Sequence, residues 1–335
     1  RALRDNPQRF SSALSAFPAP VLVRILHFAP RMSDSYDVTI VGGGPAGLTA
    51  ALFLARYLHS VVLVDSRDPR NWEARGINGY LGLHGITPPE LRERGRAEAA
   101  RYGAELVDGC VSTIRQEGED RFVTLLEGGQ TFASKRLLLA IRINDVWPQI
   151  PGLDRCYGQT VHHCPDCDGR ESRDKCTVVI ASGRSAAGMA FSLTTWTRDI
   201  TICTNGKPAG IEPAVRAKLD ALGIRVVEQP IVRLESEAAE VRALMLEDES
   251  VLHCERVFFA IGHYPADDLG VQLGCKRDDE GLIVVDDKYR TSVRNVFAAG
   301  DITPGPHLAI AAAGGGAVAA LAIHASLVPD ERRLD

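Results

Sequence analysis

Residues 36–65, YDVTIVGGGPAGLTAALFLARYLHSVVLVD, place a glycine-rich turn between two short apolar runs. Residues 38–41 predict a buried strand, 42–47 give the pattern G-x-G-x-x-G, and small and apolar residues then predict a helix to about residue 58. A second apolar strand follows at 61–64. This order is typical of a dinucleotide-binding βαβ unit, so it restricts the fold to the α/β class.

Each glycine of this turn has its own physical role. Gly42 permits the tight turn, Gly44 lets the backbone approach a pyrophosphate, and Gly47 lets the helix pack closely on the strand. The free N–H groups at the helix start attract phosphate, and Asp65 at the end of the second strand can accept bonds from a ribose. The alternative is a glycine-rich turn of another α/β fold, which would not need strand, helix and acid in register.

A second, altered unit lies at residues 176–206. Strands are predicted at 177–180 and 200–203, but the glycine positions of the turn between them are Ala181, Gly183 and Ala186. Alanine at the first position disfavours the tight turn. The second strand is followed by Thr204-Asn205-Gly206, with neither an acid for a ribose nor a basic cluster for a 2′-phosphate. The pattern predicts a second Rossmann-like domain in which NADPH binding is doubtful.

Cys164 and Cys167, within HHCPDCDG at 162–169, are two thiols three positions apart. Such a pair indicates either a redox disulfide or a metal site. Zinc would require further ligands, for which Cys156, His162, His163 and Cys176 are candidates, but a second C-x-x-C is missing. The redox disulfide is favoured, and no metal is expected; His162 and His163 are interpreted as polar residues of a strand end or loop.

Composition excludes some partners. A net charge of −5 leaves no basic excess for nucleic acid, and the absence of a long apolar run predicts no spanning helix and no membrane association. Eight sparse cysteines fit a reducing, cytoplasmic setting. Residues 1–32 are interpreted as an N-terminal extension ahead of a start at Met32, with an arginine-rich transit peptide as the alternative.

Five elements together resemble the low-molecular-weight thioredoxin reductases, a family of FAD-dependent disulfide oxidoreductases, and among them members with a degenerate NADPH site. They are GGGPAG at 42–47, NGYLG at 78–82, CPDCDG at 164–169, the second βαβ unit, and FAAGD at 297–301. The likeness extends from about residue 36 to 327.

The resemblance implies two Rossmann-like, three-layer domains, the second inserted in the first. An FAD-binding domain would comprise 33–146 and 267–328, an NAD(P)H-like domain carrying the cysteines would comprise 147–266, and 329–335 would be a tail. Cofactor-binding residues would be Gly42, Gly44, Pro45, Ala46, Gly47, Asp65, Asn78, Gly300, Asp301, His307, Leu308 and Ala309. Asp301 would bond the ribityl chain, and the helix beginning near His307 would face the flavin.

The implied reaction is thiol–disulfide exchange. Cys167 would face the flavin, Cys164 would attack a disulfide on a thioredoxin-like protein or a small molecule, and Asp168 would move protons. Members are usually homodimers. Ala140-Ile141-Arg142 and His307-Leu308 depart from the family's usual residues at the hinge and last helix.

The electron donor stays open between NADPH, NADH, ferredoxin and a dithiol. A dithiol oxidase that passes electrons to oxygen is one alternative, and a non-catalytic flavin-binding redox sensor is another. Five arginines are interpreted as a solvated face, or as a docking patch for an acidic protein such as ferredoxin: Arg70, Arg75, Arg92, Arg94 and Arg96.

Overall fold

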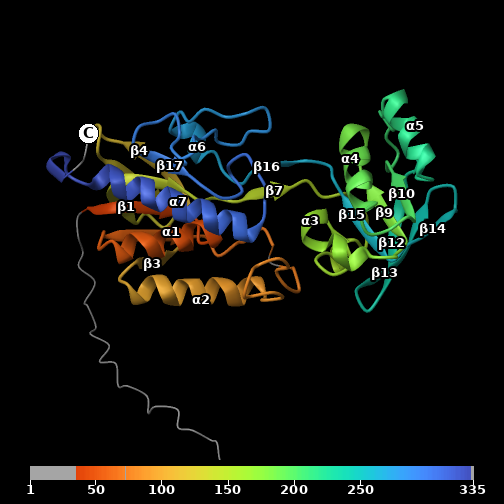
Figure 1. The fold of residues 1–335 in the computed structure, drawn as a ribbon, viewed down its shortest axis with the longest axis horizontal. Helices are drawn as coiled ribbons and strands as arrows, with labels where there is room; N and C mark the ends of the chain where they lie inside the picture. Colours follow the sequence, from red (N-terminus) through yellow and green to blue (C-terminus); the bar gives the residue numbers. More distant parts are fainter. Residues whose placement is uncertain (1–34, 72, 333–335) are drawn as a thin grey trace, which may run out of the picture. The chain divides into compact units, whose positions relative to one another are not determined.

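The computed structural model describes residues 35–71 and 73–332. The predicted extension at 1–32 and the last three residues of the predicted tail therefore lie outside the described residues. The α/β class is confirmed, because two mainly parallel sheets, each flanked by helices, are built from separate parts of the chain (Figure 1).

The first sheet has seven strands, in the order β3-β2-β1-β6-β5-β4, with β17 also paired to β6. The nine-residue β6 is shared: its first half pairs antiparallel with β5, and its second half pairs parallel with β17, while β1 runs parallel along its other edge. The strands are β1 Tyr36–Val41, β2 Val61–Asp65, β3 Glu105–Asp108, β4 Val111–Gln116, β5 Phe122–Leu126, β6 Thr131–Leu139 and β17 Val296–Ala298.

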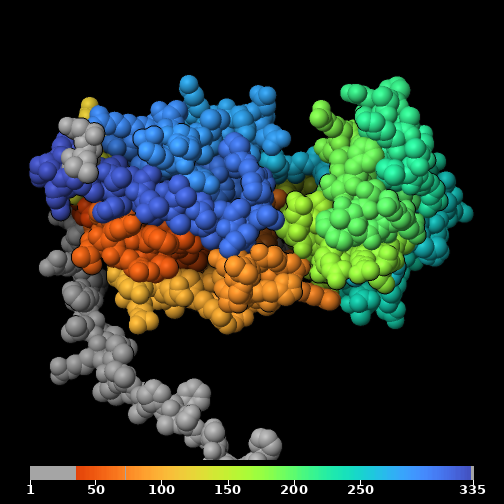
Figure 2. All heavy atoms as spheres, in the orientation of Figure 1, coloured from red at the N-terminus to blue at the C-terminus, as the bar shows by residue number. Residues whose placement is uncertain are grey.

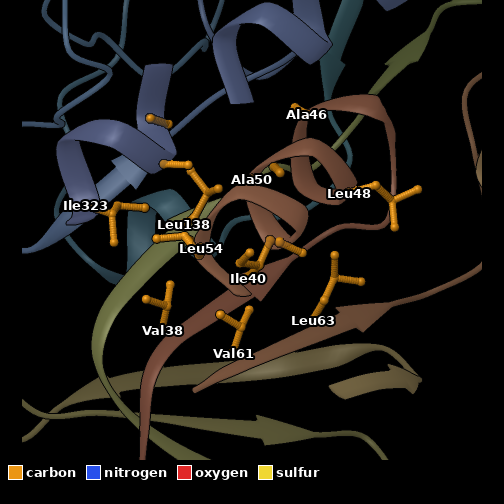
Figure 3. Close-up of a cluster of buried hydrophobic side chains, with 14 of the residues drawn as sticks. Val38, Ile40, Ala46, Leu48, Ala50, Leu54, Val61, Leu63, Leu138 and Ile323 are labelled. Carbon is orange, nitrogen blue, oxygen red and sulfur yellow. The ribbon is translucent and has the colours of Figure 1, made fainter. Parts of the chain in front are cut away.

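Helices α1 (Pro45–Arg56) and α7 (Ala309–Leu327) pack together on one face of this sheet. Figure 3 shows Leu54 and Ile323 from these helices beside Val38, Ile40 and Leu138 of the sheet, all five almost fully buried. Alanine and glycine dominate the contact because the backbones approach closely: a Cβ at Gly316 would lie 2.1 Å from the Ala46 carbonyl oxygen. Helix α2 (Pro88–Arg101) lies alongside, begun by Pro88 and by Thr87, which accepts a bond from the Glu90 N–H.

The expectation of no long apolar run is wrong for α7. By length and composition, this 19-residue helix is long and apolar enough to cross a membrane. About a third of its apolar stretch is buried. Its inner face packs on α1 as described above, and the same composition serves close packing there. Figure 2 shows that α7, in dark blue, also forms part of the surface, where Ile310, Val318 and Leu321 are partly exposed.

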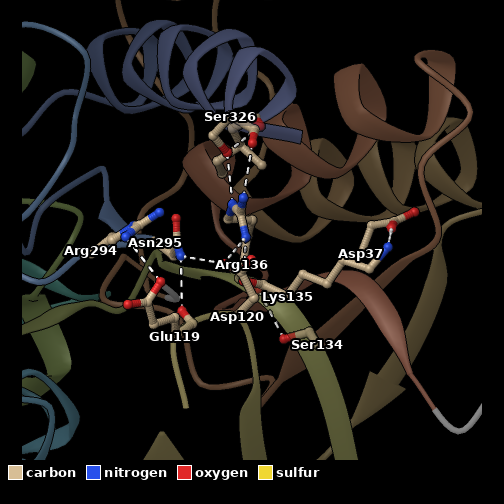
Figure 4. A network of polar contacts seen from close by, with 10 residues as sticks. Asp37, Glu119, Asp120, Ser134, Lys135, Arg136, Arg294, Asn295 and Ser326 are labelled. Carbon is tan, nitrogen blue, oxygen red and sulfur yellow. Dashed lines mark hydrogen bonds and ion pairs between the residues drawn. The ribbon is translucent and has the colours of Figure 1, made fainter. Parts of the chain in front are cut away.

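A cluster of polar contacts fastens the far end of α7 to the sheet (Figure 4). Arg136 of β6 is 8% exposed; its Nε and Nη2 donate to the Ser326 hydroxyl and carbonyl, both at 2.9 Å. Its Nη1 reaches Asp120 at 3.0 Å, and Asp120 also accepts a bond from the Asn295 amide at 2.7 Å. Segments from four parts of the chain are thereby joined.

The second sheet is fully parallel, in the order β11-β10-β9-β15-β8. Its strands are β8 Val161–His162, β9 Thr177–Ile180, β10 Ile200–Cys203, β11 Arg225–Val227 and β15 Arg256–Phe259. Around it lie helices α3 Pro165–Asp168, α4 Gly183–Leu193 and α5 Pro213–Ala221, and an antiparallel sheet of β12 Ile231–Glu237, β13 Glu240–Leu246 and β14 Val251–His253.

Two antiparallel strands, β7 (Ile143–Asp145) and β16 (His263–Pro265), carry the chain into and out of this second part. The short helix α6 (Leu269–Gln272) follows β16. The division expected at 146/147 and 266/267 falls next to these strands, and the boundaries themselves stay a prediction.

Candidate functional site

The GGGPAG turn forms an open cradle at the start of α1. Gly42 has φ +112°, and a Cβ there would lie 2.2 Å from the Ala140 carbonyl oxygen. A Cβ at Gly47 would lie 1.9 Å from the Gly42 carbonyl oxygen, so only glycine allows α1 to approach the strand this closely. A Cβ at Gly44 would meet nothing within 4 Å. The backbone at Gly44 is therefore accessible to a ligand.

This turn lines a cavity of about 450 Å³. The redox cysteines Cys164 and Cys167 line the same cavity, together with Asp168. Of the predicted cofactor residues, only Gly47 does not, because it lies in the helix–strand contact. The others on its wall are Gly42, Gly44, Pro45, Ala46, Asp65, Asn78, Gly300, Asp301, His307, Leu308 and Ala309.

Asp65 ends β2 as predicted and is 5% exposed. Its Oδ2 accepts bonds from Arg92 at 2.7 Å and Arg96 at 3.0 Å, and its Oδ1 accepts the Arg67 N–H at 3.0 Å. Two guanidinium groups therefore pair with this carboxylate beneath Gly43, in the place where a ribose would meet it.

The interpretation of the arginines as a solvated face is wrong for three of the five. The side chains of Arg70, Arg92 and Arg96 are only 12–13% exposed, because each forms ion pairs with carboxylates inside the domain. Arg94 is 57% exposed, and Arg75 is exposed and donates to the Gln159 side chain. The alternative, a docking patch for an acidic protein, is therefore weakened, because three of its five positive charges are paired with carboxylates of this chain.

Arg70 joins two carboxylates at the cavity. It donates two bonds to Asp145 of β7, at 2.6 and 2.8 Å, and one to Asp301, at 3.0 Å. Burial opposes ionisation of Asp145, but the bonds from Arg70 outweigh it and keep the pKa of this carboxyl below its ordinary value. Asp301, predicted to bond the ribityl chain, is thus oriented by Arg70.

The Asp145 carboxylate also faces His163, the residue that precedes Cys164. His163 Nε2 lies 3.8 Å from Asp145 Oδ2, and its Nδ1 shares a hydrogen bond of 2.9 Å with the Tyr157 hydroxyl. Burial lowers the pKa of His163, while Asp145 opposes this shift. Burial also raises the pKa of Tyr157, so both groups are neutral near pH 7.

Helix α7 begins at Ala309, with Leu308 as its N-cap, two residues after the expected start. His307 lies edge-on to His263, with 5.5 Å between ring centroids. Its buried Nε2 has no hydrogen-bond partner in the described chain. Burial lowers the pKa of His307, so the imidazole presents a neutral ring to the cavity.

Cys164 and Cys167 form a disulfide at the start of the short helix α3. Cys164 is the N-cap, and its sulfur accepts a bond from the Cys167 N–H at 3.1 Å. Since both sulfurs are bonded to each other, the zinc alternative has lost its central ligands, and Cys156 and Cys176 are free thiols. Asn78, predicted for the cofactor, donates to the Cys167 carbonyl at 3.3 Å and to Asp168 at 3.4 Å.

The second βαβ unit has the predicted strands but a closed turn. The N–H of Gly183, the first residue of α4, donates to the carbonyl of Ala209 at 2.6 Å. The Asn205 side chain, at the end of β10, accepts the Ile231 N–H at 2.7 Å. The Gly183 N–H and the Asn205 side-chain oxygen are thus hydrogen-bonded within the chain.

Sequence reasoning did not predict the contacts of four residues at the cavity, which are Arg70, Asp145, Tyr157 and His163. Arg70 and Asp145 are 75 positions apart, and neither belongs to a glycine or cysteine motif. The one available signal was Asp145 itself, an acid just before the apolar Val146-Trp147.

Fold and site together define a dinucleotide-binding redox protein with a disulfide facing its cofactor cavity. Comparison with known proteins makes this specific. The pyridine nucleotide-disulphide oxidoreductase family matches residues 36–316, and the chain belongs to this family.

Curated relatives include the thioredoxin reductase of Mycolicibacterium smegmatis, 31% identical over 85% of this chain and 94% of that protein. The bifunctional thioredoxin reductase/thioredoxin of Mycobacterium leprae (strain TN) is 32% identical over 85% of this chain and 64% of its own length. Among solved structures, HlmI superposes with TM-score 0.84 at 36% identity, covering 88% of this chain and 93% of the other. The putative thioredoxin reductase TrxB of Bacillus anthracis gives TM-score 0.83 at 28% identity, covering 89% of this chain and 100% of the other.

The protein is therefore a flavin-dependent disulfide oxidoreductase related to thioredoxin reductases, a group that uses FAD with NADPH as second cofactor. The residues present fit FAD, because the backbone at Gly44 is open to the cavity and the Asp65 carboxylate lies on the same cavity wall. Bound there, FAD supplies two-electron exchange with the disulfide.

Proposed function

We propose that this enzyme exchanges electrons between FAD and the disulfide of a thioredoxin-like protein through Cys164 and Cys167, without a pyridine nucleotide at its second βαβ unit. The observation that carries the exchange is the common cavity, whose wall includes both the GGGPAG cradle and the two cysteines. The names of the relatives support a thioredoxin-like partner.

The exchange uses the two sulfurs in turn. Cys164 Sγ, as thiolate, attacks one sulfur of the partner disulfide, and the partner's other sulfur leaves as a thiolate. Cys167 Sγ then attacks Cys164 Sγ, which restores the Cys164–Cys167 disulfide and releases the partner as a dithiol. Asp168, next to Cys167 in the chain and in contact with Asn78, would take the proton of the second thiol and return it to the leaving sulfur.

The bond from Gly183 to Ala209 argues against NADPH as the donor. A pyrophosphate at the start of α4 would have to displace this internal carbonyl, and nothing at 204–206 would hold the ribose phosphate. Electrons would instead reach the flavin from ferredoxin or a similar one-electron carrier, or from a dithiol.

One observation favours the dithiol oxidase as a second candidate. Cys164 and Cys167 are only half-buried and face the cavity, so a small dithiol can reach them there. In that reaction the dithiol becomes a disulfide, and its two electrons and two protons reduce oxygen to hydrogen peroxide through the flavin.

The homodimer and the cytoplasmic location also stay proposals.

An anaerobic titration of the purified flavoprotein tests the donor. We expect stoichiometric NADPH or NADH to leave the visible flavin absorbance unchanged, and dithiothreitol to bleach it. Bleaching by NADPH would overturn the proposal for the second unit. Peroxide formation from a small dithiol in air, with no reduction of thioredoxin by photoreduced enzyme, would establish the oxidase instead.

A further inference from the structure

His162 is a buried polar residue that the exchange described above does not use. It ends β8, in parallel register with Phe258 of β15, and its side chain is 5% exposed. The imidazole packs on the Phe258 ring with 5.3 Å between centroids. His162 was expected at a strand end or in a loop, and it does lie at a strand end. Its burial was not expected, because a polar loop residue is normally exposed.

The contacts of the imidazole point to Asp168. Nδ1 of His162 lies 3.4 Å from Asp168 Oδ2, while Nε2 is buried without a partner in the described chain. Interaction with the carboxylate requires a hydrogen on Nδ1, while the buried Nε2 has no partner in the described chain. This arrangement costs stability, because a buried polar atom stays unsatisfied.

Asp168 is thus held from two sides. Asn78 approaches its Oδ1 at 3.4 Å from the first sheet's domain, and His162 approaches its Oδ2 from the strand that precedes the cysteines. His163 cannot substitute for His162, because its two nitrogens are directed to Tyr157 and Asp145. His162 is therefore the one imidazole of this segment directed at Asp168.

We propose that His162 is a positioning residue, which holds the Asp168 carboxylate toward Cys167 through Nδ1–H. The proposal rests on the proposed function. In the resolving step, Cys167 Sγ bonds to Cys164 Sγ while the bond from Cys164 to the partner's sulfur breaks. The proton passes from the Cys167 thiol to Asp168 and then to the departing thiolate, so no electron donor is consumed.

The resolving step can be measured without a continuous supply of electrons, because the enzyme is reduced beforehand. The enzyme is reduced with dithiothreitol, freed of it anaerobically, and mixed with 5,5′-dithiobis(2-nitrobenzoate). In the first turnover, one aryl thiolate is released when Cys164 attacks and a second when Cys167 resolves the mixed disulfide. All variants carry Cys110→Ser, because Cys110 is an exposed free thiol. A Cys164→Ser/Cys167→Ser protein gives the background, and two-phase release persisting in it would refute the proposed redox pair independently of His162.

A double-mutant cycle then isolates His162. We expect Asp168→Asn to slow the second phase about 100-fold, which is the usual size of a proton-transfer contribution. His162→Phe should slow it about 10-fold, and the double variant should be no slower than Asp168→Asn alone, because His162 acts through that carboxylate. Multiplying effects, about 1000-fold together, would overturn the proposal.

Conservative variants distinguish positioning from packing, and they apply equally if His162→Phe does not fold. His162→Asn places an amide N–H near the position of Nδ1, and His162→Gln places it near Nε2. We expect Asn to restore the second phase to within about 3-fold of the parent and Gln to leave it slow. Equal rates for the two would contradict the proposal. His253→Asn, at an exposed histidine of the same part of the chain, is the matched control and should not change the rate.

Discussion

Arg70 and Asp145 form a two-bonded ion pair, at 2.6 and 2.8 Å, with side chains only 13% and 9% exposed. Asp145 belongs to a strand that leads into the second part of the chain, and Arg70 follows β2 of the first. The pair therefore fixes this strand to the wall of the cofactor cavity, and through Asp145 it also orients His163 beside the redox cysteines.

Replacing Arg70 by Met should lower the free energy of unfolding by about 3 kcal/mol, because the buried Asp145 and the partly buried Asp301 would both lose their countercharge. Urea denaturation followed by circular dichroism measures this loss. Arg94→Met is the control and should change stability by less than about 0.5 kcal/mol, since that ion pair is exposed. Equal small effects of both changes would show that the buried pair does not stabilise the fold.

Gly47 and Gly44 should respond differently to alanine. Gly47→Ala would place a methyl group 1.9 Å from a backbone oxygen, so we expect a loss of about 3 kcal/mol in stability. Gly44→Ala meets nothing within 4 Å in the protein, so stability without flavin should stay within about 0.5 kcal/mol while FAD affinity falls. Thermal unfolding of flavin-free protein and FAD titration separate the two effects. Unchanged FAD affinity in Gly44→Ala would contradict the placement of the cofactor.

The two cysteines should differ in what they trap. Cys167→Ser leaves the attacking Cys164 without a resolving partner, so a mixed disulfide with thioredoxin should accumulate. Cys164→Ser should trap none, because Cys167 is the resolving sulfur. Intact-mass measurement after mixing each reduced variant with oxidised thioredoxin gives the result. Trapping by Cys164→Ser instead would reverse the assigned roles.

Stability should fall as the pH is lowered from 7 to 5. Burial lowers the pKa of His163 below the 6.5 of an unfolded chain, although Asp145 opposes this and Arg70 and His162 assist it. Below pH 6.5 the unfolded state binds the proton more readily than the folded state, so acid favours unfolding by at most about 1.4 kcal/mol per pH unit for this group. His163→Asn should reduce this slope in denaturation curves at several pH values. A slope unchanged from the parent protein would exclude His163 as a contributor.

The local patterns were sufficient for the elements but not for the ion pairs. Strands 177–180 and 200–203 were placed to the residue because apolar runs bounded by polar residues determine them locally. The bonds of Arg70 depend on β7 and the loop before α2 meeting in space, which periodicity does not encode. The same limit explains why Arg92 and Arg96 were assigned to a solvated face: their partner Asp65 had been assigned only to the cofactor.

The hydrogen bond that closes the turn at Gly183 was not expected from the sequence. The missing glycine and missing charges at the second unit predicted weak nucleotide binding. That the Ala209 carbonyl occupies the N–H of Gly183 follows from the path of a loop 26 residues further along, which the sequence did not reveal.

The sharing of β6 has a consequence for synthesis of the protein on the ribosome. Strand β1 is synthesised before the other strands of its sheet. Strand β17, which pairs with the second half of β6, is synthesised only after residue 295. Ile323, which belongs to the same hydrophobic core, follows later still. All strands of the second sheet, by contrast, have been synthesised once Phe259 is in the chain. We therefore expect the inserted part to fold first during translation, while the amino-terminal strands wait for the carboxyl-terminal helix to emerge.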